Sequence, residues 1–143
     1  MILRRLFFLL LCTFLPMAAL AVDTPTPYNY ISATALEARL TAKELIHLVD
    51  IQVEEEFAKH HITGATATFA YPVKTETEKA KLQAVLTKLK TDNAPVVVIC
   101  PRGAGGATRT YDYLLSQGIA AERLHILEKG QEGWACPTLT EGK

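Results

Sequence analysis

The hydrophobic positions of the chain follow two periodicities in turn. Nearly continuous apolar runs, typical of strands covered on both faces of a sheet, occur at residues 44–51, 96–99 and 124–127. Apolar residues spaced three and four apart, typical of amphipathic helices, occur at residues 82–89 and 107–115. Because runs of the first kind alternate with runs of the second, the pattern predicts an α/β fold with a mainly parallel central sheet and helices on both faces.

Capping residues add boundaries to this pattern. Thr75 and Glu78 have the spacing of a capping box, so we expect one helix to begin there and to continue to Leu89. The helix that contains residues 107–115 is expected to end at Gly118, a typical helix-terminating glycine. Shorter elements complete the expected order, namely strands at residues 28–31 and 66–69 and helices after Ser32 and at residues 54–59.

Residues 1–21 have the features of a secretory signal peptide. Two arginines precede an apolar segment, and Ala19-Leu20-Ala21 is a cleavage pattern of the small-x-small type. An uncleaved membrane anchor is the alternative, but the apolar segment is short and contains Pro16. We therefore expect residues 1–21 to be removed, which implies a periplasmic or secreted protein with no membrane contact after cleavage.

The remaining chain is expected to form one domain. Residues 22–27 contain two prolines and are predicted to be a linker, followed by a folded domain at residues 28–137 and a polar tail at residues 138–143. The 15 basic and 15 acidic residues of the chain balance, so no charge excess favours nucleic acid or an anionic membrane surface. His60 and His61 are adjacent and their side chains point apart, so a turn is favoured over a metal site. We expect no metal or other cofactor.

Cys100 is the candidate nucleophile. It directly follows the apolar run at residues 96–99, and a glycine-rich loop and a predicted helix come after it. Glycine amides, a helix N-terminus and arginine side chains all stabilise negative charge on a sulfur atom. The residues expected to supply them are Arg102, Gly103, Ala104, Gly105, Gly106, Ala107 and Arg109. Such a loop suits either a persulfide or an oxyanion of phosphate or arsenate; the alternative is that Cys100 is a small buried hydrophobe at a strand end.

Three segments give the chain its resemblance to a known family. Residues 50–65, which run from Asp50 to Ala65, are similar to the first signature of single-domain rhodaneses, and residues 97–100 with the following loop are similar to their catalytic segment. Residues 127–134, ending at Trp134, are similar to the closing signature. The resemblance implies a three-layer rhodanese-like fold, with Cys100 carrying sulfur as a persulfide and Asp50 in a supporting role.

Three positions and the length of the loop depart from the family pattern. Gln52 stands where arginine is usual, and Lys129 stands where glycine is usual. Gly105 occupies the place of the loop arginine, and the loop is one residue longer than usual. Longer loops are associated with phosphatase or arsenate-reductase relatives, but those relatives carry Cys-x5-Arg, and that place is Gly106 here.

The resemblance therefore implies a thiosulfate sulfurtransferase-like enzyme. It would pass sulfur from a small anionic donor such as thiosulfate to cyanide or a thiol. The alternatives are a cysteine-dependent phosphatase or arsenate reductase and a non-catalytic binding module. The resemblance also implies that the loop before Trp134 lies close to the catalytic loop, which would bring Cys136 within reach of Cys100. Cys136 would then resolve the persulfide or pair with Cys100, with a periplasmic thiol-redox partner; the alternative, which we favour, is a free cysteine.

Overall fold

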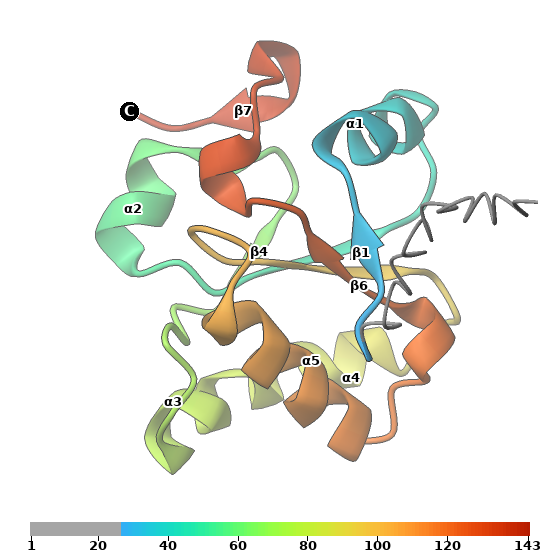
Figure 1. Ribbon diagram of the computed structural model, residues 1–143, viewed down its shortest axis with the longest axis vertical. Coiled ribbons are helices and arrows are strands. Elements are labelled where there is room, and N and C mark those ends of the chain that lie inside the picture. Colours follow the sequence, from blue (N-terminus) through green and yellow to red (C-terminus); the bar gives the residue numbers. More distant parts are fainter. Residues whose placement is uncertain (1–26) are drawn as a thin grey trace, which may run out of the picture.

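The computed structural model describes residues 27–143 (Figure 1). The predicted signal peptide at residues 1–21, and residues 22–26 of the predicted linker, lie outside this part. Within the described part, no helix has the length and apolar character needed to cross a membrane.

The core of the domain is a five-stranded sheet in the order β1-β6-β5-β2-β4, and all of its strand pairs are parallel. The strands are short, and β5 in the middle is buried along its whole length. The bounds of the five strands are Tyr30–Ile31 (β1), His47–Asp50 (β2), Thr66–Ala67 (β4), Val96–Ile99 (β5) and Leu124–Leu127 (β6). The prediction of a mainly parallel sheet is confirmed.

Helices cover both faces of the sheet (Figure 1). On one face, α4 and α5 pack on the alternate strand residues that include Val96 and Val98. On the other face, Leu36 of α1 and Trp134 pack on the set that includes Val97 and Ile99. The bounds of the helices are Ala33–Thr41 (α1), Glu54–Lys59 (α2), Glu76–Lys81 (α3), Gln83–Leu89 (α4) and Gly105–Ser116 (α5), with short 3-10 turns at Ala121–Arg123 (η1), Gln131–Gly133 (η2) and Pro137–Leu139 (η3).

The helix predicted from Thr75 to Leu89 is divided in two. The capping box forms as expected, because the Thr75 hydroxyl accepts from the Glu78 amide and the Glu78 carboxylate accepts from the Thr75 amide. The regular pattern then breaks at the buried Leu82, where the Leu82 amide donates to the Lys79 carbonyl three residues back. Two shorter helices, α3 and α4, replace the single one.

Residues 138–143 differ from the expected loose tail. They contain part of η3 and the strand β7 (Thr140–Glu141), which pairs antiparallel with β3 (His61–Ile62). The Trp134 indole N–H donates to the Thr140 hydroxyl over 3.0 Å, and the Lys143 amide donates to the Ala58 carbonyl over 3.0 Å. The β3–β7 pairing and the bond from Lys143 to Ala58 join distant parts of the chain, so no local sequence pattern predicts them.

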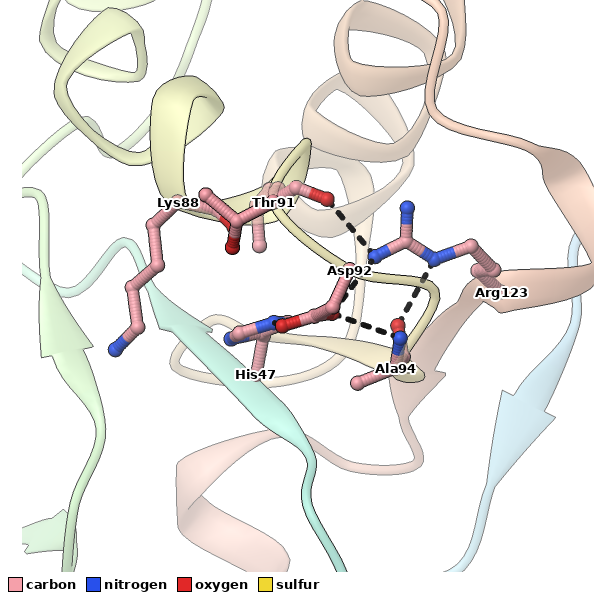
Figure 2. A network of polar contacts seen from close by, with 7 residues as sticks. His47, Lys88, Thr91, Asp92, Ala94 and Arg123 are labelled. Carbon is pink, nitrogen blue, oxygen red and sulfur yellow. Dashed lines mark hydrogen bonds and ion pairs between the residues drawn. The ribbon is translucent and has the colours of Figure 1, made fainter.

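A polar cluster fixes the amino-terminal end of the central strands (Figure 2). The Asp92 carboxylate lies 3.0 Å from the His47 Nε2 atom, 3.7 Å from the Arg123 Nη2 atom, and accepts from the Ala94 amide over 2.8 Å. The Ala94 amide and His47 hold the pKa of Asp92 below its usual value. His47 is the first residue of β2, and the other members precede β5 and β6, so the cluster anchors all three strands at the end opposite Cys100.

Candidate active site at the Cys100 loop

Cys100 lies at the carboxyl edge of the sheet, where it follows the central strand β5. The strands β2 and β6 pair with β5 on either side, so their carboxyl ends flank the cysteine. Functional groups in open parallel sheets gather at this edge. The Cys100 residue is only 2% exposed and packs with the core on the α4–α5 face.

The Gly103 amide donates to the Cys100 sulfur. The N–Sγ distance is 3.0 Å, and Gly103 reaches this position with a φ of 68°. A Cβ at Gly103 would lie 2.7 Å from the Leu127 carbonyl oxygen and 2.8 Å from the Lys129 amide nitrogen. Glycine is therefore required here both for its backbone conformation and for the close approach of residues 127–130.

The segment after β6 holds the other side of the loop. The Gln131 amide donates to the Cys100 carbonyl over 2.8 Å, and the Glu132 amide donates to the Pro101 carbonyl over 3.0 Å. Gly130, with a φ of 56°, has no room for a Cβ beside the Cys100 carbonyl. The loop after Cys100 and the segment at residues 127–134 are thus joined by backbone hydrogen bonds.

The amides expected to line the loop fall into two groups. The Ala107 amide donates to the Ala104 carbonyl over 2.9 Å, so it belongs to the first turn of α5. The amides of Arg102, Ala104, Gly105 and Gly106 make no hydrogen bond with any residue in the 27–143 range. These four groups and the Gly103 amide are the donors that the loop offers to negative charge.

Arg109 reaches back over Gly105. Its Nε and Nη2 atoms donate to the Pro72 carbonyl over 2.9 Å and 2.8 Å. A Cβ at Gly105 would lie 2.9 Å from the Arg109 Nη1 atom. The guanidinium therefore lies against the position where the family pattern has its loop arginine. It also ties the start of α5 to residues 69–73.

Tyr71 fills the space beside Gly106, the position at which phosphatase relatives carry the arginine of Cys-x5-Arg. A Cβ at Gly106 would lie 3.0 Å from two ring atoms of Tyr71 and 3.2 Å from the Ile51 Cδ1 atom. A side chain at residue 106 would need these neighbours to move. The Cys-x5-Arg arrangement is therefore absent from this loop for a steric reason as well as by sequence.

Arg102 is turned toward solvent. Its Nη1 atom lies 3.6 Å from the Glu132 Oε1 atom, and the two side chains are 65% and 63% exposed. An ion pair this exposed contributes little to stability. The structure places the charge of Arg102 beside Glu132 on the surface of the loop.

Asp50 is the buried end of a hydrogen-bonded series. Its carboxylate accepts from the Gln52 amide over 2.9 Å and from the Gln52 Nε2 atom over 3.0 Å. The Nε2 atom also donates to the His60 carbonyl, and the Gln131 Nε2 atom lies 2.8 Å from the His60 Nδ1 atom. Burial raises the pKa of Asp50 from 3.8 to about 6, although both hydrogen bonds from Gln52 oppose the rise. Asp50 thus supports the segment that binds the loop.

The sequence reasoning missed Gln131, Tyr71 and Pro72 as parts of the site. The glutamine follows the positive-φ pair Lys129 and Gly130, and this glycine is the local signal that could have placed it at a turn. Tyr71 and Pro72 carry no such signal, because they approach the loop only through the fold.

Cys136 and Cys100 are both buried and unpaired. Cys136 packs with Trp134 in the core on the α1 face, whereas Cys100 packs in the core on the opposite face. The Cys136 sulfur lies 3.4 Å from the Thr138 hydroxyl. The structure therefore separates the two thiols by the plane of the sheet.

The chain belongs to the rhodanese family, since the profile of the rhodanese-like domain matches residues 32–136. No curated protein matches it. Among solved structures it resembles a yeast protein tyrosine phosphatase of the rhodanese family, with a TM-score of 0.65 and 18% identity over 83% of this chain and 95% of the other. It also resembles a thiosulfate sulfurtransferase from Pseudomonas aeruginosa, with a TM-score of 0.59 and 21% identity over 80% of this chain and 19% of the other. For a rhodanese-like domain protein from Staphylococcus aureus the TM-score is 0.57 and the identity is 20%, over 80% of this chain and 98% of the other. At these identities the structures share the fold, which is the one that the sequence predicts.

Proposed function

We propose that the protein is a sulfurtransferase that carries sulfane sulfur as a persulfide on Cys100. The Cys100 thiolate attacks the outer sulfur of a donor such as thiosulfate. A new S–S bond forms as the donor S–S bond breaks, and sulfite leaves with the bonding electron pair. A thiol or cyanide then removes the outer sulfur and releases the Cys100 thiolate, so no external oxidant is needed.

The observation that carries this proposal is the shape of the loop around the sulfur. The Gly103 amide donates to the Cys100 sulfur over 3.0 Å, and the four other free amides can stabilise charge on a second sulfur atom. Residue 106 is glycine, and Tyr71 occupies the space beside it. The loop therefore lacks the arginine with which an oxyanion of phosphate would be clamped.

A phosphatase or arsenate reductase is the second candidate. Its support is the longer loop and the likeness to a yeast phosphatase of the same family. It requires a guanidinium at the oxyanion, and Arg109 already donates through Nε and Nη2 to the Pro72 carbonyl. We therefore place this function behind sulfur transfer.

Intact-mass analysis after incubation with thiosulfate tests the proposal. One added sulfur atom should appear on the wild type and on Cys136→Ser, be absent from Cys100→Ser, and disappear on addition of cyanide. Turnover of an aryl phosphate or of arsenate that depends on Cys100, without any sulfur adduct, would support the second candidate. Absence of all three reactions would favour a binding module.

The cellular location and the partners are part of the same proposal. A signal peptide at residues 1–21 would deliver the domain to the periplasm or outside the cell, where its partners would be a small sulfur-donor anion, a thiol acceptor and a thiol-redox protein. Amino-terminal sequencing of the protein purified from a periplasmic fraction tests this, because cleavage after Ala21 should leave Val22 as the first residue.

A further inference from the structure

A hollow of about 410 Å³ lies beside the catalytic loop. Pro101, the residue after the nucleophile, forms one wall, and Gln131 and Glu132 of η2 form another. The remaining walls come from the segment after β2, through Gln52, Glu56 and Lys59. The backbone bonds from Gln131 to Cys100 and from Glu132 to Pro101 fix this hollow next to the loop.

The polar groups of the hollow are mostly acceptors. Glu56 and Glu132 supply two carboxylates, and Lys59 supplies one ammonium. Neither Glu56 nor Lys59 forms an ion pair with a described residue. The partner of Glu132 is the exposed Arg102 at 3.6 Å, and an ion pair this exposed leaves the carboxylate free to bind another cation.

Gln131 adds an independent sign that a donor is missing. Its residue is 3% exposed, and its Oε1 atom has no hydrogen-bond partner among the residues of the described range. Its Nε2 atom is already engaged with the His60 ring. A buried amide oxygen without a donor is costly, so a turn of the Gln131 side chain toward the hollow would let a ligand N–H group satisfy it.

We infer that this hollow binds the sulfur acceptor, and that the acceptor is a small thiol bearing an ammonium group. The ammonium would lie toward Glu56 and Glu132, where the carboxylates attract it and disfavour an anionic thiol. This inference rests on the proposed sulfur transfer. In the step itself the acceptor thiolate attacks the outer sulfur of the persulfide. An S–S bond to the acceptor forms, the Cys100 Sγ–S bond breaks, and the Cys100 thiolate leaves with the electron pair.

The test compares three thiols of similar size and different charge. The protein is loaded with sulfur from thiosulfate, freed of excess donor, and mixed with 2-aminoethanethiol, 2-mercaptoethanol or mercaptoacetate. Intact mass reports the rate at which the adduct is lost. For each thiol the rate of Glu56→Gln is divided by the rate of the wild type, so differences in intrinsic thiol reactivity cancel.

Glu56→Gln should slow discharge by 2-aminoethanethiol roughly threefold to tenfold, as removal of one charge at contact distance in water predicts. It should leave 2-mercaptoethanol unchanged and accelerate mercaptoacetate. Glu55→Gln is the matched control, because Glu55 is an exposed glutamate of the same helix that does not line the hollow. Equal ratios for the three thiols, or the same pattern in Glu55→Gln, would overturn the inference.

A binding measurement keeps the two proposals separate. The Cys100→Ser variant is titrated with 2-aminoethanethiol and followed by amide NMR shifts. Shifts at Gln52, Glu56 and Gln131 support the site even where the wild type takes no sulfur, an outcome that defeats the proposed function alone. A loaded wild type with no shifts at these residues defeats the inference and leaves the sulfurtransferase intact.

Discussion

Replacing Asp50 with asparagine should remove a pH dependence from the stability of the domain. Asp50 is fully buried, and its pKa of about 6 in the folded protein lies above its ordinary value of 3.8. Between these two values the folded state retains a proton that the unfolded chain has lost. Stability therefore falls as the pH rises through this window and is constant with respect to this group above it.

The size of the effect follows from the same two values. Each pKa unit corresponds to ~1.4 kcal/mol, so the rise from 3.8 to about 6 amounts to roughly 3 kcal/mol of stability lost between pH 4 and pH 7. Asparagine cannot ionise, yet its carbonyl oxygen can still accept from the Gln52 amide. The difference in unfolding free energy between wild type and Asp50→Asn should thus change by roughly 3 kcal/mol over this range.

Urea unfolding from pH 4 to pH 8 measures the difference directly. Other groups titrate in both proteins, so only the difference between the two curves reports on Asp50. Gln52→Arg provides a second variant, because a cation beside the carboxylate lowers its pKa and the adjoining hollow has room for the longer side chain. In that variant the free energy of unfolding should fall less steeply with rising pH than in the wild type. Parallel curves for wild type and Asp50→Asn would show that burial does not control the ionisation of this carboxyl.

Three further substitutions test separate parts of the structure. Lys129 has a φ of 59°, so Lys129→Gly should raise the free energy of unfolding by about 0.5–1 kcal/mol in urea titrations; a loss of stability would refute this. Gly105→Ala should displace the Arg109 guanidinium and slow persulfide formation about fivefold, or ~1 kcal/mol; an unchanged rate by intact mass would remove Arg109 from the site. Thr75→Ala should lower the free energy of unfolding by about 1 kcal/mol, because the Glu78 amide loses its acceptor at the Thr75 hydroxyl. An unchanged unfolding midpoint would contradict this.

The elements that the sequence predicts well are those with local causes. The capping box forms because the Thr75 hydroxyl accepts from the Glu78 amide while the Glu78 carboxylate accepts from the Thr75 amide. The strand before Cys100 forms because a continuous β-branched run is stable only when both faces are covered. In each case the residues that determine the structure lie within one turn or one strand.

The parts that the sequence did not predict depend on contacts between distant segments. The pairing of β7 with β3 joins residues about 80 positions apart, and residues 138–143 are polar enough to resemble a loose tail. Tyr71 reaches Gly106 only because β4 lies beside β2 in the sheet. The distance between Cys136 and Cys100 could not be predicted either, because it depends on which face of the sheet each thiol occupies.

The position of Arg109 lies between these two cases. Gly105 and Arg109 are four residues apart at the start of α5, and helical side chains point toward the helix N-terminus. A long side chain at residue 109 therefore reaches the space that a glycine at residue 105 leaves empty. The charge missing from the loop is thus supplied from the next turn, but the Nε–Nη2 edge donates to the Pro72 carbonyl. An arginine whose Nε–Nη2 edge is engaged in this way contributes positive potential and holds residues 69–73 in place. The proposed preference for charge on sulfur over a phosphate therefore rests on the Gly103 amide at the Cys100 sulfur and on the glycine at residue 106, where phosphatase relatives carry arginine.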